Sequence, residues 1–266
     1  MAALATMVDY LDVILATQDT PDYAGAVNGL QLENDGRVTR VAAAVDYSTR
    51  TVAGCAEAGC DLLIVHHGMF WSGAQPLRGR VYARLKMLIA HNVAVYASHL
   101  PLDRHPELGN NVLLARALGL VPDGDFARYQ TIPVGVRGES DVPTAELLRR
   151  AETFAAAHGG QVRSAGQVGP ASTGDEGGRR TRRWAICTGA GASSETLREA
   201  ADGGIDTLIV GEGPHHSYVE ANDMEDLVVI YAGHYATETL GVRALAERVS
   251  ERFGVPWAFI DAPTNS

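Results

Sequence analysis

The chain has 266 residues, of which 46% are hydrophobic and 20% are charged, and its net charge is −10. This length and composition are enough to bury a large core, and no apolar run approaches the roughly 18 residues that a membrane span needs. The acidic balance disfavours general nucleic-acid binding, because affinity for phosphates comes largely from Lys and Arg.

The opening segment predicts an amphipathic helix and not a signal peptide, because Asp9 and Asp12 interrupt its apolar residues and it has no basic start. The three cysteines, Cys55, Cys60 and Cys187, lack Cys-x-x-Cys spacing. An odd number in this arrangement argues against a disulfide framework and a thiolate zinc site. We therefore expect buried thiols in a reducing cytoplasm.

Apolar, β-rich segments alternate with helical patterns along the rest of the chain. The expected strands are 38–45, 61–65, 93–97, 132–137, 183–188, 206–210 and 227–232. The expected helices are 50–58, 82–91, 110–118, 144–158, 194–202 and 238–253. This alternation is typical of βαβ units, with a parallel or mixed sheet flanked by helices.

An internal repeat divides the chain into two halves. AGCDLLIVHHG (58–68) resembles GGIDTLIVGEG (203–213), and VAVYASHLPLD (93–103) resembles VVIYAGHYATE (228–238). The second segment of each pair ends in His-x-x-x-carboxylate, which raises the similarity above that of any two apolar strands. We expect two related α/β lobes, at 1–130 and 131–266. The Gly- and Ser-rich stretch 159–183 should be an exposed, flexible loop of the second lobe.

The first candidate site is the pair His66 and His67, which follows a buried strand and precedes Gly68. Polar residues at the carboxyl end of a parallel strand lie where α/β proteins place their sites. Neighbouring side chains of an extended chain point to opposite faces. Two adjacent histidines can therefore serve one metal only if the chain turns; otherwise they suit two metals, or one metal and one core contact.

The second candidate is His234 with Glu238, after another buried strand. Thr237 is a plausible N-cap, so Glu238 would open the last helix, where the helix N-terminus stabilises an anion. Imidazole and carboxylate together favour Zn²⁺, Mn²⁺ or Fe²⁺.

The third candidate is SHLPLD, residues 98–103, which Pro101 predicts to be a loop. Asp103 suits a terminal metal ligand. His99 is either a ligand or, the reading we favour, a donor that orients one.

Together, these segments supply three imidazoles and two carboxylates, from His66, His67, Asp103, His234 and Glu238. A single zinc takes three or four protein ligands. Five ligands with one bridging carboxylate suit two metals roughly 3.5–4 Å apart that share a water, which becomes a nucleophile near neutral pH.

Five motifs, GLQLE, HHGMFW, SHLPLDRHPELGNN, GEGPHH and GHYATE, occur in this order along nearly the whole chain. They resemble the Nif-three-like dinuclear metal-binding family, whose members are also called GTP cyclohydrolase I type 2 homologues. The resemblance implies two interlinked α/β lobes and a hexameric ring. It also implies one metal held by His67, Asp103 and Glu238, and a second held by His66, His234 and Glu238.

Three functions remain open from the sequence. The best-supported one is a metal-dependent hydrolase with an unknown small-molecule substrate, in which Glu238 and a shared water make the nucleophile. His99, and with it the loop residues Glu212, His215 and His216, could then carry protons. The chain has no GxxxxGK[ST] phosphate loop, so no motif supports nucleotide binding.

The same ligands could instead serve a metal carrier or a regulatory metal-binding protein. A weaker alternative is a ring that binds single-stranded nucleic acid, which would need Arg78, Arg80 and Arg84 to line its cavity. The sequence predicts no membrane partner.

Overall fold

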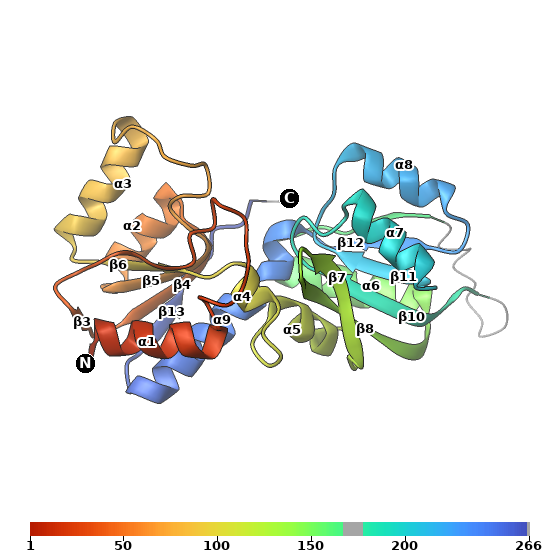
Figure 1. The fold of residues 1–266 in the computed structure, drawn as a ribbon, viewed down its shortest axis with the longest axis horizontal. Coiled ribbons are helices and arrows are strands. Elements are labelled where there is room, and N and C mark those ends of the chain that lie inside the picture. Colours follow the sequence, from red (N-terminus) through yellow and green to blue (C-terminus); the bar gives the residue numbers. More distant parts are fainter. Residues whose placement is uncertain (167–177, 265–266) are drawn as a thin grey trace. The chain divides into compact units, whose positions relative to one another are not determined.

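The computed structural model describes residues 1–166 and 178–264, which form two compact α/β units (Figure 1). The first unit combines Met1–Leu108 with Thr239–Ala262, and the second combines Gly109–Glu238 with the chain from Pro263. The chain thus leaves the first unit and later returns to it, so the two units are interlinked. A simple division at residue 130 does not describe this path, because the last long helix is shared by the two units.

The first unit contains a five-stranded sheet in the order β13-β4-β5-β6-β2, in which only β2 is antiparallel to its neighbour. Its strands are β2 (Gly29–Leu32), β4 (Val41–Asp46), β5 (Leu62–His67), β6 (Ala94–Ala97) and β13 (Trp257–Phe259). A short antiparallel pair, β1 (Ala2–Ala3) and β3 (Arg37–Val38), lies apart from this sheet. The helices are α1 (Leu4–Leu15), α2 (Thr49–Glu57), α3 (Gly79–Ala90) and α4 (Leu100–Asp103).

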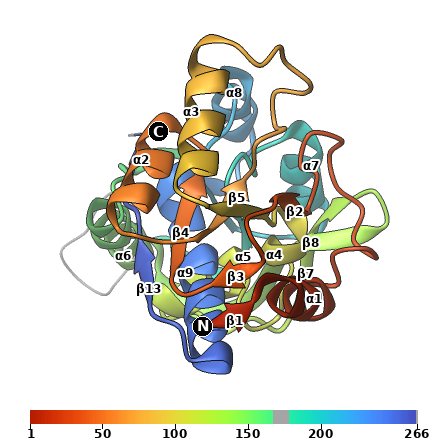
Figure 2. The ribbon, with the colours of Figure 1, turned by 90° about the vertical axis from the view of Figure 1, so that its left-hand side faces the viewer.

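Alternation along the central strands divides the core of the first unit into two layers. Leu63 and Val65 of β5 pack with Val52 of α2 and Leu88 of α3 on one face of the sheet. Tyr96 of β6 contacts α1, where its hydroxyl donates a hydrogen bond to Oδ1 of Asp12. Figure 2 shows α2 and α3 on one side of the sheet and α1 on the other.

The second unit contains a six-stranded mixed sheet in the order β7-β8-β10-β11-β12-β9. Its strands are β7 (Gly124–Tyr129), β8 (Ile132–Pro143), β9 (Arg163–Ala165), β10 (Arg180–Cys187), β11 (Thr207–Val210) and β12 (Val228–Tyr231). Its helices are α5 (Asn110–Ala117), α6 (Thr144–Ala157), α7 (Ser194–Asp202) and α8 (His215–Asp223), and it also holds the start of α9 (His234–Phe253). Leu197 of α7 and Ala221 of α8 pack on Leu208 and Val229 of the sheet.

The internal repeat corresponds to a repeated topology. In the first unit, β4, β5 and β6 are parallel neighbours connected through α2 and α3; in the second, β10, β11 and β12 are parallel neighbours connected through α7 and α8. Each unit also has an antiparallel strand beyond the third of these, β2 next to β6 and β9 next to β12. The predicted fold class, two similar α/β lobes with mixed or parallel sheets flanked by helices, is confirmed.

Several local predictions need correction. The expected loop at SHLPLD instead contains a single helical turn, α4. Pro101 does not prevent this turn, because it lies at the start of the helix, where proline is tolerated. The polar loop GEGPHH ends in the first residues of α8. Helix α9 begins at His234 and not at Glu238, so Thr237 lies within its first turn.

The stretch 159–183, expected to be an exposed loop, holds paired strands at both of its ends. Residues Arg163–Ala165 pair with β12, and β10 begins at Arg180 and pairs with β8. Strand pairing satisfies the backbone N–H and C=O groups of these segments, although their side chains are mostly polar. The central residues 167–177 lie outside the described part of the chain. Among the described residues, no helix is long and apolar enough to cross a membrane.

Candidate metal centre

His66 and His67 are the last two residues of β5, at the carboxyl end of a parallel strand. His66 is fully buried and His67 is partly buried. Consecutive Cα atoms are only about 3.8 Å apart, and the two ring centroids lie 4.9 Å from each other. The pair therefore stays close although the strand is extended, and no turn at Gly68 is needed.

Each of these rings has its Nδ1 atom fixed by an acceptor. Nδ1 of His66 donates to the carbonyl oxygen of Ser98 at 2.8 Å, and Nδ1 of His67 donates to Oδ1 of Asp46 at 2.8 Å. A carbonyl oxygen and a carboxylate oxygen both act as acceptors, so in each contact Nδ1 is the donor and carries the proton. The Nε2 atoms then carry the lone pairs that a metal would take.

His99 follows the same pattern. Its Nδ1 donates to Oδ1 of Asp22 at 2.9 Å, and Asp22 also accepts from the side chain of Asn28 and the backbone N–H of Leu100. Burial alone would raise the pKa of Asp22, but the hydrogen bond and charge of His99, together with the other donors, lower it. Asp22 is thus held as a carboxylate that orients His99.

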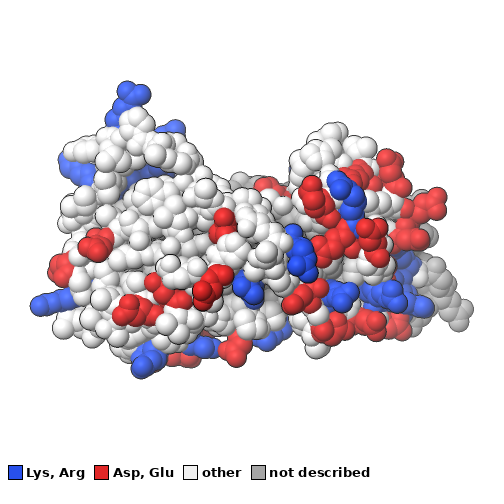
Figure 3. Space-filling model, viewed as in Figure 1, with Lys and Arg blue, Asp and Glu red and all other residues white. Residues whose placement is uncertain are grey.

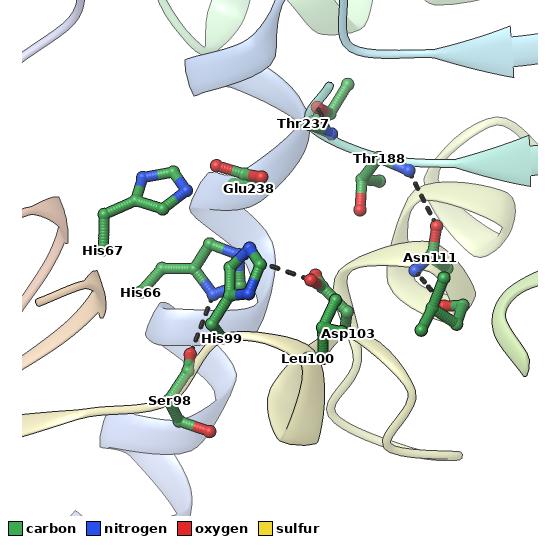
Figure 4. A network of polar contacts seen from close by, with 12 residues as sticks. His66, His67, Ser98, His99, Leu100, Asp103, Asn111, Thr188, Thr237 and Glu238 are labelled. Carbon is green, nitrogen blue, oxygen red and sulfur yellow. Dashed lines mark hydrogen bonds and ion pairs between the residues drawn. The ribbon is translucent and has the colours of Figure 1, made fainter. Parts of the chain in front are cut away.

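The first unit therefore brings three imidazoles and one carboxylate together (Figure 4). One ligand atom from each of His66, His67 and His99 lies within 4.8 Å of the others. Oδ2 of Asp103, on the buried turn α4, lies 3.4 Å from Nε2 of His66. His99 lies close to His66 and His67 because β5 and β6 are neighbouring parallel strands that end at the same edge of the sheet.

The second unit supplies a His–Glu pair from the start of α9. His234 and Glu238 are four residues apart, so they lie on one face of the helix. Nε2 of His234 lies 3.1 Å from Oε2 of Glu238, and Nδ1 lies 2.8 Å from Oε1 of Glu212. Burial alone would lower the pKa of His234, but the two carboxylates outweigh it and raise the pKa to about 9.

Gly189, in the loop after β10, leaves room for the carboxylate of Glu238 because it has no side chain. A Cβ atom on Gly189 would collide with Oε1 of Glu238, and the positive φ of 63° also favours glycine. The backbone N–H of Gly189 donates to Oγ1 of Thr237 at 3.1 Å. Gly189 is not among the site residues predicted from the sequence, although the glycine-rich run TGAGA follows an expected strand and was a signal for it.

The donor set fits divalent metals. Four buried or partly buried imidazoles, His66, His67, His99 and His234, each have Nδ1 hydrogen-bonded to a carbonyl or carboxylate, as metal-ligating histidines usually do. Imidazole combined with carboxylate suits Zn²⁺, Mn²⁺ and Fe²⁺. The other two candidate proton carriers, His215 and His216, are exposed at the start of α8 and belong to none of the metal-type groups found among residues 1–166 and 178–264.

Comparison with known proteins decides the family. The model of the Duf34/NIF3 (NGG1p interacting factor 3) family matches residues 2–266. This chain belongs to the NIF3 family.

Curated NIF3 relatives and solved structures cover nearly the same length. A GTP cyclohydrolase 1 type 2 homolog from Halobacterium salinarum is 43% identical over 91% of this chain and 92% of its own. One from Deinococcus radiodurans is 38% identical over 90% and 86%. A structure from Thermus thermophilus has a TM-score of 0.83 at 36% identity, and that of protein ybgI, of unknown function, has 0.86 at 34%; both cover 100% of each chain.

Proposed function

We propose that this NIF3 protein binds two divalent metal ions per chain and is a metal-dependent hydrolase. The observation that carries the proposal is the shared orientation of the histidines. Each has its Nδ1 hydrogen-bonded to a carbonyl or carboxylate oxygen, which orients the ring as the partners of metal-ligating histidines do. Core histidines need only one satisfied hydrogen-bond partner each, and nothing in packing alone would require all four to use the same atom.

The proposed ligands are His66, His67, Asp103, His234 and Glu238. We keep the grouping that the family resemblance implies, with Glu238 shared between the ions. The carboxylate of Glu238 is buried, as that of a ligand shared by two ions would be. Oδ2 of Asp103 lies 3.4 Å from Nε2 of His66, and metal loading of Asp103→Asn tests its assignment to the ion of His67.

Bound divalent ions would polarise the scissile group of a substrate and supply an ionised water with a pKa lowered towards about 7. The chain would supply the rest. Glu238 would help to hold the nucleophile. His99 has Nδ1 fixed by Asp22, so its Nε2 could accept or release a proton. In this proposal Asp46 and Glu212 keep His67 and His234 oriented.

The substrate is a small molecule of unknown class. The curated relatives are named as cyclohydrolase homologues, and such chemistry on a nucleotide is one case of the proposed hydrolysis. The acidic net charge, and the acidic side chains gathered on the second unit in Figure 3, disfavour a nucleic-acid partner. By resemblance, we also propose a cytoplasmic homohexamer.

Metal analysis combined with a substrate screen tests the proposal. Protein purified without added metal and then loaded with Zn²⁺, Mn²⁺ or Fe²⁺ should hold two ions per chain. It should also hydrolyse at least one ester, amide or nucleotide, with activity that rises with pH through the neutral range. One ion per chain at saturation would contradict the dinuclear centre. Two ions that exchange rapidly with a chelator, without any turnover, would instead favour a metal carrier.

A further inference from the structure

We propose that Trp71 and Tyr23 form a binding corner for the flat, heteroaromatic ring of a substrate, next to the histidines of the first unit. The inference rests on the proposed function and adds a substrate class to it. Both residues are exposed aromatics, Trp71 by 42% and Tyr23 by 52%. Large apolar side chains that stay exposed beside a polar cluster often mark a ligand site.

The corner adjoins the candidate metal ligands directly. The ring centroid of Trp71 lies 4.6 Å from that of His99 and 5.1 Å from that of His67. The ring of Tyr23 lies 5.9 Å from His99. A ring held against Trp71 would therefore place its attached groups beside the imidazoles.

None of the three rings next to Trp71 is stacked flat against it. Its ring planes make angles of 69° with Tyr23, 62° with His99 and 52° with His67, so no described ring lies flat upon it. Aromatic pairs favour offset stacking or an edge-to-face arrangement. A flat ligand in this corner could stack on Trp71 and meet Tyr23 edge to face, which an aliphatic group could not match.

The two loops that carry Tyr23 and Trp71 are held together by hydrogen bonds and close backbone packing. Gln31 joins the two loops: its side-chain oxygen accepts from the N–H of Met69 at 2.6 Å, and its side-chain nitrogen donates to the carbonyl of Val27 at 2.8 Å. A Cβ atom on Gly25 would lie 2.8 Å from the carbonyl oxygen of Trp71, so the loops approach as closely as glycine permits. A preorganised surface loses little conformational freedom on binding.

Val27 adds a sign that this loop is under constraint. Its φ of 42° lies in the left-handed region, which β-branched residues rarely adopt. Such strain persists only where neighbouring contacts impose it, and it gathers at ligand sites.

Equilibrium dialysis with adenosine, cytidine and nicotinamide as ring probes tests the corner, with ribose as the probe that lacks a ring. The full chain would be used both loaded with zinc and free of metal. We expect saturable binding of at least one ring probe and none of ribose. Trp71→Ala should weaken binding by roughly 10-fold or more, and Trp71→Phe should restore most of it. Tyr23→Ala should weaken it less, and Tyr82→Ala, which removes an equally exposed tyrosine from α3, should have no effect.

The outcomes separate this inference from the metal centre. Absence of binding by all three ring probes, or equal binding by wild type and Trp71→Ala, would overturn the aromatic corner while leaving metal content unaffected. Sedimentation of wild type and Trp71→Ala checks the other occupant: a change in the number of chains per particle would show that a second copy covers Trp71, and would also overturn the proposal. Ring binding by the metal-free protein would stand even if the hydrolase screen found no turnover.

Discussion

His67 and Asp46 share one register position on the neighbouring parallel strands β5 and β4, and Nδ1 of His67 donates to Oδ1 of Asp46 at 2.8 Å. The contact sets both the tautomer and the direction of the ring. We expect Asp46→Ala to lower affinity for the metal at His67 by about 10–100-fold, as loss of such partners usually does. Asp46→Asn should cost less, because its amide oxygen still accepts the hydrogen bond.

Competition with a fluorescent zinc chelator would measure this affinity. The control is Asp9→Asn, which removes an exposed carboxylate on α1 that is distant in sequence from Asp46 and His67. Equal affinities for wild type and Asp46→Ala would show that His67 needs no orienting partner, or that it is not a ligand.

Glu238 is expected to matter to both ions if it bridges them. Glu238→Gln keeps the volume of the side chain but removes the charge that two cations would share. Metal content after loading should fall for both sites, towards fewer than one ion per chain. Asp103→Asn, which removes a proposed terminal ligand, should weaken one site only. Loss of a single ion from Glu238→Gln would make Glu238 a terminal ligand.

His99 and Asp22 separate an orienting role from a ligand role. If His99 acts on protons or orients its neighbours, His99→Ala should retain two ions per chain and lose activity by about 10–100-fold. Asp22→Asn should reproduce part of the loss, because it removes the charged partner of the hydrogen bond that orients His99. Metal loss from His99→Ala equal to that from His67→Ala would make His99 a ligand.

Much of the fold was predictable because the signals were local. The apolar runs before His66 and before His234 predicted strands, and the repeat predicted two similar sheets. Helix α9 begins at His234, four residues before the predicted start at Glu238. Gly233 and Thr237 are typical of a link and an N-cap, although the helix already includes Thr237. The role of Asp46 was not predictable, since it depends on a pairing between β4 and β5 that fixes one residue opposite another.

Gly189 is expected to tolerate no side chain. Gly189→Ala would place a methyl group on the carboxylate of Glu238 and would force alanine into a left-handed conformation. We expect a lower melting temperature and weaker metal binding in this variant. Gly36→Ala is the control, because Gly36 also has a positive φ but meets nothing within 4 Å. It should show only the conformational cost, about 1 kcal/mol or somewhat more. Identical metal affinity for the two variants would mean that the contact with Glu238 does not position the carboxylate.

His234 predicts how the stability of the metal-free protein depends on pH. Its pKa is raised from an ordinary 6.5 to about 9 by Glu238 and Glu212, in spite of burial. Since the folded pKa lies above the unfolded one, protonated His234 stabilises the fold fully below about pH 6.5, and this contribution is lost as the pH rises through about 9. Its size is at most on the order of 3 kcal/mol.

Melting temperatures of the metal-free protein should therefore fall between pH 6.5 and 9, and His234→Gln should flatten that fall. Zinc should reverse it, because a metal binds the neutral imidazole in place of the proton and stabilises the folded chain. The zinc effect should accordingly grow with pH, and it should be small in His234→Gln. A fall in melting temperature that is the same in wild type and variant would assign the pH dependence to other groups and would remove the support for a charged His234 beside Glu238.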